Sequence, residues 1–471
     1  MKLNYKRVFL VGMAFFLISA FWQAYDAIVP LILTNHFGLP QTASGVVMSF
    51  DNILAVFLLP IFGAISDKVN TKYGRRTPFI VIGSLIAMVS FICLTFIDNY
   101  QLAKIADPIV PMIEMTAEEY AAYLREYAFN MTMSNPLPLV GFIATLLVVL
   151  VAMAIFRSPA VALMPDVTVK PLRSKANAII NLMGAVGGVL YLIFTAIMYP
   201  ESKTSGVDHV NYLPLFIAVM AVIFISLMIM IFFVNEPKLA KAQQEYEDAH
   251  PEENLTETTE NNKAVLPKPV KRSLIFLLLS VAFWYIGYNG IVTFFTNFTQ
   301  NVWGVGIGGA STCLTIATGA AIVCYIPAGI LASKIGRKKT IIAGALLLAS
   351  SFLAGFIYTL FVNTFHPALY VLFALVGIAW ATINVNSFPM VVEMCHGSDI
   401  GKFTGLYYTF SMAAQIVTPI IAGFLIEKID YKVLFLYSAI FVFLSFITMC
   451  FVKHGDTKIE RKKGLEAFDV D

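Results

Sequence analysis

Long, uninterrupted runs of apolar residues dominate this chain, and short polar segments separate them. The runs do not alternate between apolar and polar positions, so they predict helices and not strands. A run of about 20 apolar residues is long enough to cross the hydrocarbon core of a bilayer as a helix. Twelve such spans are predicted, at roughly 8–34, 43–66, 78–97, 139–165, 175–199, 212–234, 273–300, 309–332, 339–361, 368–393, 403–426 and 432–452.

Composition leads to the same fold class, an all-α membrane protein. Only 13% of the residues are charged, 58% are apolar, and the mean hydropathy is +0.78. A soluble domain keeps about a quarter of its residues charged because its surface faces water. We therefore expect a multi-pass protein of an inner or plasma membrane, with the lipid bilayer as its surroundings. The net charge of +3 and the scattered basic residues argue against a nucleic-acid partner.

The distribution of lysine and arginine predicts the orientation. Assigned to the loops between the predicted spans, 26 of these residues fall on one side of the membrane and 5 on the other. Cytoplasmic loops carry the excess of basic residues, so both termini are expected in the cytoplasm. The predicted organisation is a six-helix bundle (1–234), a cytoplasmic linker (235–272), a second six-helix bundle (273–452) and a cytoplasmic tail (453–471).

An internal repeat supports two related halves. Trp22 precedes Thr34-Asn35 by twelve residues, and Trp284 precedes Thr296-Asn297 by the same distance. The loops after the second span of each half match as well, Gly63-Ala-Ile-Ser-Asp67 and Gly74-Arg75-Arg76 in one half and Gly329-Ile-Leu-Ala-Ser333 and Gly336-Arg337-Lys338 in the other. Repeats of this kind place a substrate site between the halves, near the midplane of the membrane.

These loops resemble the signature loop of the major facilitator superfamily. The longer spacing of the first copy is similar to that of the glycoside–pentoside–hexuronide cation symporters and the sucrose-transporter-like branch. Asp26, followed by Pro30 and then by Gly38-Leu39-Pro40, resembles the first helix of that branch. The end of the fourth span resembles it too, over Ser158-Pro159-Ala-Val-Ala-Leu-Met-Pro-Asp166. The resemblance implies a secondary transporter of a sugar or glycoside, sucrose-like or maltose-like, that works by alternating access.

The chain also departs from these relatives. The arginine that the branch carries in its fourth helix would fall at Val161, and Arg157 lies one turn earlier. Asp51, in the second span, is not expected in the branch. Sodium-coupled melibiose permeases carry a pair of carboxylates just before the Pro-Ile-x-Gly of that span. The corresponding stretch here is Ala-Val-Phe-Leu-Leu, which weakens the case for sodium.

Three ionisable residues, Asp26, Asp51 and Arg157, fall clearly within the predicted spans. A charge in the hydrocarbon region is costly unless it is paired or hydrated, so these residues are candidates for proton coupling. A structural ion pair between Arg157 and one of the two acids is the alternative. Since no histidine falls within a predicted span, we expect a carboxylate to carry the proton, and we favour Asp26 over Asp51.

A sugar has polar edges and apolar faces, so it needs aromatic platforms with amide or hydroxyl partners. The candidate substrate-binding residues are Trp22, Gln23, Tyr25, Tyr285, Tyr288, Asn289, Trp380 and Asn384. Charged residues at the cytoplasmic helix ends are candidates either for a gate or for setting the topology. They are Asp67, Arg75, Arg76, Asp166 and Arg337.

The leading functional hypothesis is therefore a monomeric, proton-coupled symporter of a small molecule, a sugar or glycoside. A sodium-coupled symporter and an exporter of apolar compounds stay open as alternatives. No phosphate-binding Gly-rich loop ending in Lys-Ser/Thr is present, so ATP is not expected as the energy source, and no cofactor is expected. An enzyme is not expected, because no nucleophile or metal cluster stands out in the sequence. A membrane sensor without transport is the alternative from another class of function.

Overall fold

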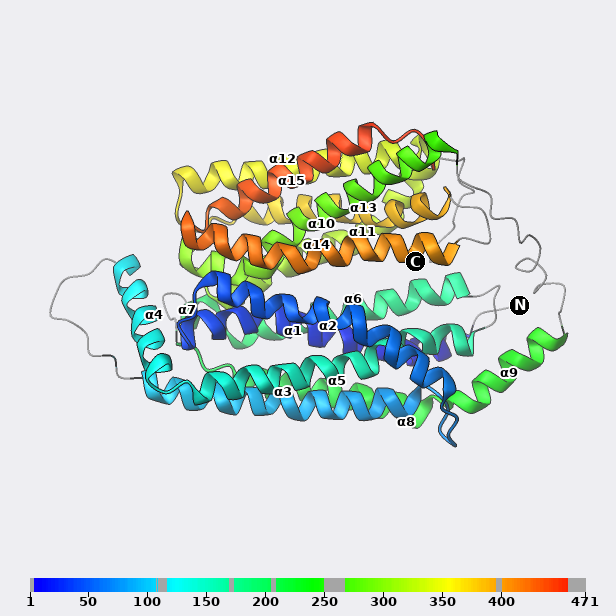
Figure 1. The fold of residues 1–471 in the computed structure, drawn as a ribbon, viewed down its shortest axis with the longest axis horizontal. Coiled ribbons are helices and arrows are strands. Elements are labelled where there is room, and N and C mark those ends of the chain that lie inside the picture. Colours follow the sequence, from blue (N-terminus) through cyan, green and yellow to red (C-terminus); the bar gives the residue numbers. More distant parts are fainter. Residues whose placement is uncertain are drawn as a thin grey trace.

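The structure is a computed structural model, and it describes residues 4–106, 108, 117–168, 173–204, 209–249, 267–394 and 400–455. Its helices run side by side along the long axis of the molecule, except α4 and α9, which project at opposite ends (Figure 1). The helices are α1 (Tyr5–Leu31), η1 (Ile32–His36), α2 (Gln41–Lys68), α3 (Thr77–Ile105), α4 (Ala117–Ser134), α5 (Leu137–Val167), α6 (Arg173–Met198), α7 (Glu201–Thr204), α8 (Leu213–Phe233), α9 (Glu236–Ala249), α10 (Lys268–Trp303), α11 (Ile307–Ile335), α12 (Arg337–Phe361), α13 (Leu369–Val392), α14 (Ile400–Lys428) and α15 (Val433–Cys450).

Twelve helices of the described residues are long and apolar enough to cross a membrane, so the predicted fold class is confirmed. Three further helices, α4, α7 and α9, are too short or too polar to span. α9 occupies the start of the segment that was expected to be a linker. The helix between the third and fourth spans is α4.

Two hydrophobic cores hold the bundle together. One is built mainly from α1, α3, α5, α6 and α8, and the other from α10 to α15. Across the boundary between the cores, α2 packs against α14 and α6 packs against α11. Counted as membrane spans, α2 and α14 are the second and eleventh, and α6 and α11 are the fifth and eighth. Replacing each span by its counterpart in the other half, six spans away, turns one pair into the other. The contacts therefore follow the approximate twofold symmetry of the sequence repeat.

The first span ends in a π-helical turn that begins just after Pro30. The Phe37 N–H donates to the Ile32 carbonyl, five residues earlier, at 3.1 Å. The Thr34 hydroxyl donates to the Pro30 carbonyl at 2.8 Å, so a side chain satisfies a group in this irregular stretch. Single π turns are common at functional sites, since the extra residue turns the following side chains to new directions. Here the turn directs Asn35 to the second half and His36 into the first.

The halves are joined at the end of the bundle that carries α4, which we call the α4 end. The opposite end, which carries α9, is the α9 end (Figure 1). Among the described residues, side-chain hydrogen bonds join the two halves at the α4 end. They are Asn297 to Thr34 at 2.7 Å, Asn35 to Gln300 at 3.1 Å, Arg125 to Asn301 at 2.5 Å, Thr42 to Glu427 at 2.6 Å and Gln41 to Tyr431.

A close helix crossing seals the same end. A Cβ on Gly45 of α2 would lie 2.1 Å from the Pro419 carbonyl oxygen of α14, so only glycine allows the two backbones to approach this closely. Gly423 of α14 meets the Gln41 carbonyl of α2 in the same way, at 2.3 Å. The two halves therefore touch backbone to backbone at the α4 end.

The orientation of the two ends in the membrane can be tested with single cysteines in a background that lacks the native ones. Tyr120 on α4 and Lys241 on α9 are both exposed. The bias of basic residues predicts that Tyr120→Cys reacts with an impermeant maleimide on intact cells and that Lys241→Cys reacts only after permeabilisation. Reaction at position 241 in intact cells would contradict the predicted orientation.

Candidate functional site

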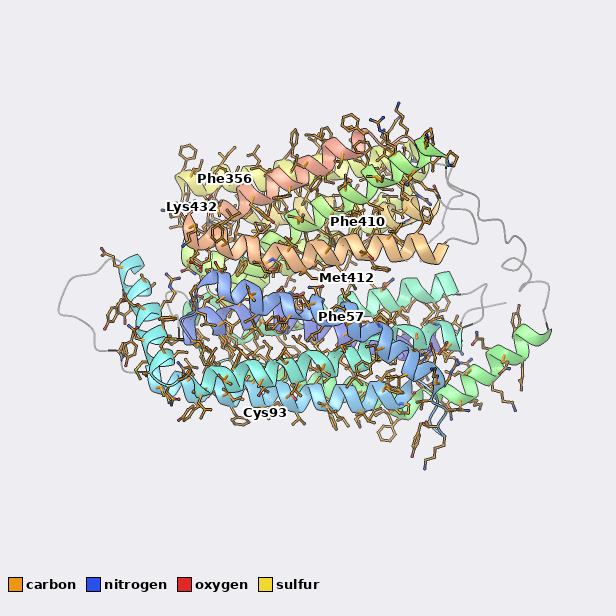
Figure 2. All side chains as sticks on the ribbon, viewed as in Figure 1. Phe57, Cys93, Phe356, Phe410, Met412 and Lys432 are labelled. Carbon is orange, nitrogen blue, oxygen red and sulfur yellow. The ribbon has the colours of Figure 1, made fainter. Side chains whose placement is uncertain are left out.

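A cavity of about 330 Å³ lies between the halves, within the spans and beyond the seal at the α4 end. Helices from both halves line it, so a molecule bound there would contact both. α1, α2 and α5 of the first half contribute Trp22, Asp26, Met48, Asp51, Asn52 and Arg157. α10 and α14 of the second half contribute Tyr285, Asn289, Val292, Thr293, Tyr408, Ser411, Met412, Gln415 and Pro419. Met412 lies where α14 faces the first half (Figure 2).

All three ionisable residues expected within the spans line this cavity. The guanidinium of Arg157 lies over the Trp22 ring, 5.4 Å from its centroid, in a cation–π contact. Among the described residues, Arg157 makes no ion pair within 4.0 Å with Asp26 or Asp51. Its charge acts more strongly on Asp51 than on Asp26. The structural ion pair considered for the sequence is therefore not formed in this conformation.

The two carboxylates have different surroundings. Asp51 accepts a hydrogen bond from the Asn52 amide at 2.8 Å, and the positive charge of Arg157 attracts its carboxylate. Both contacts favour the ionised form of Asp51. Asp26 accepts no hydrogen bond from the described residues, and the neighbouring charge that acts on it is that of Asp51. Two acids and one base share the cavity, so it carries one excess negative charge unless one carboxylate binds a proton.

The second half supplies uncharged polar groups to the cavity. On α10, Tyr285, Asn289 and Thr293 lie on one face at intervals of four residues. The Asn289 amide donates to the Tyr285 carbonyl at 2.8 Å, which fixes the side chain and leaves its oxygen as an acceptor.

A second group of these polar residues, on α14, was missed in the sequence. Tyr408, Ser411 and Gln415 recur at intervals of three and four residues, and this spacing was a detectable sign of one polar helix face.

The other predicted substrate-binding residues lie beside the cavity and do not line it. Tyr25 is fully buried with its ring edge-on to Trp22, at 5.5 Å. Gln23 faces Gly188 on α6. Tyr288 stacks on Trp380 with the ring centroids 3.8 Å apart, and Asn384 hydrogen-bonds to Tyr325.

The expectation that the spans hold three ionisable residues and no histidine is wrong. His36 lies in the π turn at the end of the first span, and Asp98 lies in the third span, which continues further than predicted. Both are fully buried, and Nδ1 of His36 is 2.5 Å from Oδ1 of Asp98. His209, in the segment before α8, packs edge-on to the His36 ring, and burial reinforced by His36 lowers its pKa to about 4. This cluster lies at the α4 end, apart from the cavity.

The predicted gate residues form two clusters at the α9 end, one in each half. Arg76 donates from Nε to Asp166 at 2.7 Å and also bonds Asp67, and Arg75 lies 3.3 Å from Asp166. Burial opposes the charge of Arg76, but the bonds to Asp166 and Asp67 outweigh it and raise the pKa of the guanidinium. Arg337 does not join this cluster, because it pairs with Glu393 in the second half.

Glu236, the first residue of α9, joins the connecting segment to the first of these clusters. Its carboxylate accepts hydrogen bonds from the backbone N–H groups of Arg75, Arg76 and Thr77 at 2.6 to 3.1 Å. These groups begin α3, where the helix dipole favours an anion. Gly74 has a φ of +110°, and a Cβ there would lie 2.2 Å from the Glu236 carboxylate, so the loop needs glycine at this position.

Comparison with known proteins decides the family. The sequence model of the Major Facilitator Superfamily matches residues 11–324 and 277–470, which together cover nearly the whole chain. The chain belongs to the Major Facilitator Superfamily. Its fold is that of the superfamily's transporters, since it resembles the crystal structure of a D-xylose-proton symporter with a TM-score of 0.64. The two share 15% sequence identity over 96% of this chain and 98% of the symporter.

Two curated relatives match shorter parts of this superfamily member. An uncharacterized MFS-type transporter of Methanocaldococcus jannaschii is 33% identical over 127 residues, 27% of this chain. The general alpha-glucoside permease of Schizosaccharomyces pombe is 27% identical over 106 residues, 21% of this chain. The matched segments span only 30% and 18% of the lengths of these relatives.

The electrostatic interaction between Arg157 and Asp51 predicts the behaviour of double variants of this superfamily member. Arg157→Ala leaves both carboxylates without a basic neighbour, so we expect uptake to fall about tenfold or more, equivalent to roughly 1.4 kcal/mol. Adding Asp51→Asn removes the uncompensated charge and should recover part of the loss. Adding Asp26→Asn should recover less, because the charge of Arg157 acts mainly on Asp51. Initial uptake rates at matched protein levels measure the difference, and equal recovery by both substitutions would contradict the assignment.

Proposed function

We propose that this superfamily member is a proton-coupled symporter that carries a sugar or a glycoside across the membrane by alternating access. The observation that carries the proposal is the composition of the central cavity. Carboxylates and a basic residue line it from one half, and aromatic, hydroxyl and amide groups line it from the other. A sugar can stack its apolar faces on the aromatic rings and exchange hydrogen bonds with the polar groups.

The names of the similar proteins agree with this chemistry. One is a D-xylose-proton symporter with the same fold, and another is an alpha-glucoside permease that matches part of the chain. The polar contacts at the two ends of the bundle also fit alternating access. The halves are bonded to each other at the α4 end, while the charge clusters at the α9 end each stay within one half. The positive-inside bias predicts that the α9 end is cytoplasmic, and with that orientation the described conformation is closed to the outside.

Within this proposal, Asp26 binds the coupled proton. Asp51 already has stabilising partners for its charge, Asn52 and Arg157, whereas Asp26 has none among the described residues. A proton on Asp26 removes the excess negative charge of the cavity and gives the carboxyl an O–H that can donate to a sugar hydroxyl. Without the proton, a closed cavity would hold an uncompensated charge, which is costly in a low-dielectric interior.

Uptake into proteoliposomes of the full chain tests the function as a whole. A panel of radiolabelled mono- and disaccharides is offered with a pH gradient, with a sodium gradient, and with neither. We expect one class of sugar to accumulate only when the pH gradient is present. Accumulation driven by the sodium gradient alone would show that sodium, and not the proton, is the coupling ion. The absence of sugar uptake under every gradient, with the protein shown to be folded, would reject the proposed substrate class.

Asp26→Asn separates binding from coupling. The amide keeps the shape of the neutral carboxyl but cannot exchange a proton, so sugar-for-sugar exchange should persist while uphill accumulation is lost. Asp430→Asn is the matched control, because Asp430 lies exposed in the loop before α15 and does not line the cavity. Uphill accumulation by Asp26→Asn with the pH dependence of the unmodified chain would shift the assignment to Asp51.

A further inference from the structure

A second pocket, of about 410 Å³, lies at the α9 end where the start of α10 meets the segment that follows α15. In Figure 1 these two segments meet at the edge of the second half that faces away from the first half. Its main lining residues are Lys268, Arg272, Ser273, Phe451, Lys453 and His454. None of them lines the central cavity, so the pocket is separate from the proposed transport site.

Ser273 builds the pocket by holding the chain that leaves α15. Its side chain is buried, and its hydroxyl oxygen accepts a hydrogen bond from the Lys453 backbone N–H at 3.1 Å. The same hydroxyl lies 2.8 Å from Nδ1 of His454 and can donate its proton to that nitrogen. The proton of a neutral His454 ring is then on Nε2, which can donate to a ligand. Neither of these bonds involves the Lys453 ammonium group.

The pocket carries positive charge that the described structure does not neutralise. The side chains of Lys268, Arg272 and Lys453 are exposed, and among the described residues none of them makes an ion pair within 4.0 Å. No aspartate or glutamate is among the lining residues of the described chain. α10 begins at Lys268, so the positive end of its helix dipole lies at the same place.

One wall of the pocket is apolar. Phe451 and Phe276 stack with their ring centroids 5.3 Å apart, and the Arg272 guanidinium lies over Phe276 at 5.7 Å. Phe451 is 54% exposed and Ile275, next to Phe276, is 48% exposed. These residues belong to, or directly follow, two of the helices that are long and apolar enough to cross a membrane, so we expect their exposed surfaces to face acyl chains. The site therefore places basic groups directly beside surface that faces acyl chains.

We propose that this pocket binds a phosphate group, the group carried by the headgroup of an anionic phospholipid in the leaflet at the α9 end. Lysine and arginine near a membrane surface attract anionic lipid, and basic pockets between transmembrane helices hold such headgroups. The planar guanidinium of Arg272 and the two flexible lysines can surround the phosphate oxygens. The adjacent aromatic wall suits the first methylene groups of the acyl chains. A bound lipid of this kind would hold the start of α10 to the end of α15.

The test uses the full-length protein in detergent and a fluorescent phosphatidylglycerol as the probe. Competition by unlabelled phosphatidylglycerol, by phosphatidylcholine and by inorganic phosphate measures the affinity for each. The test variant is Lys268→Gln with Lys453→Gln, which leaves the Ser273 bond to the Lys453 backbone and the Arg272 contact in place. The matched control is Lys6→Gln with Arg7→Gln, two exposed basic residues at the start of α1.

We expect phosphatidylglycerol to bind about 25-fold more weakly to the test variant, roughly fivefold for each basic residue removed. The control variant and a charge-keeping Lys268→Arg with Lys453→Arg variant should bind as the unmodified protein does. Preferential competition by phosphatidylglycerol identifies a lipid as the source of the phosphate. Equal competition by inorganic phosphate, lost in the test variant, identifies a soluble phosphate compound instead. Unchanged binding by the test variant, or equal weakening in the control, overturns the proposal.

Discussion

The hydrocarbon core of a bilayer offers no hydrogen-bond partner, and every other feature of this structure depends on that constraint. The backbone meets it by forming helices, in which each peptide group bonds within its own segment. Many serine and threonine side chains meet it in the same way. Thr195 and Thr382, for example, donate to the carbonyl four residues earlier. A polar side chain that does not bond its own helix must therefore find another helix, water or a ligand.

The polar residues that turn away from their own helices fall into groups with different consequences. Amides and hydroxyls at the α4 end bond across the halves and hold that end closed. Arginines at the α9 end bond carboxylates of their own half, so they stabilise each half without joining the two. In the central cavity, Asn289, Ser411 and Gln415 donate to carbonyls of their own helices, whereas Asp26 accepts no hydrogen bond from the described residues. The same chemistry thus joins the halves at one end, forms clusters within each half at the other end of the described structure, and supplies polar groups to the cavity between them.

How much of this follows from the sequence depends on whether a feature is local. The twelve spans follow from apolar runs, because a run of sufficient length has no other stable conformation in lipid. Asp26, Asp51 and Arg157 could be found because charge is rare in a span, and all three line the cavity. His36 was missed because a π turn lengthens the first span. Ser411 and Gln415 were missed because hydroxyls and amides are common in such helices, and only packing decides which face meets the cavity.

The sequence repeat does not extend to the chemistry of the two halves. Trp22 lines the cavity beneath Arg157, whereas its counterpart Trp284 is fully buried. Asp26 and Asn289 both line the cavity, but only the aspartate can change its charge. Under the proposed function, a proton therefore alters the electrostatics of one half while the other half presents groups of constant charge. A ligand shifts a conformational equilibrium only through its different affinity for the two states. Coupling then requires that one conformational state be stabilised more than the other when Asp26 is protonated and a sugar contacts both halves. A cavity lined by both halves allows a bound sugar to make these contacts.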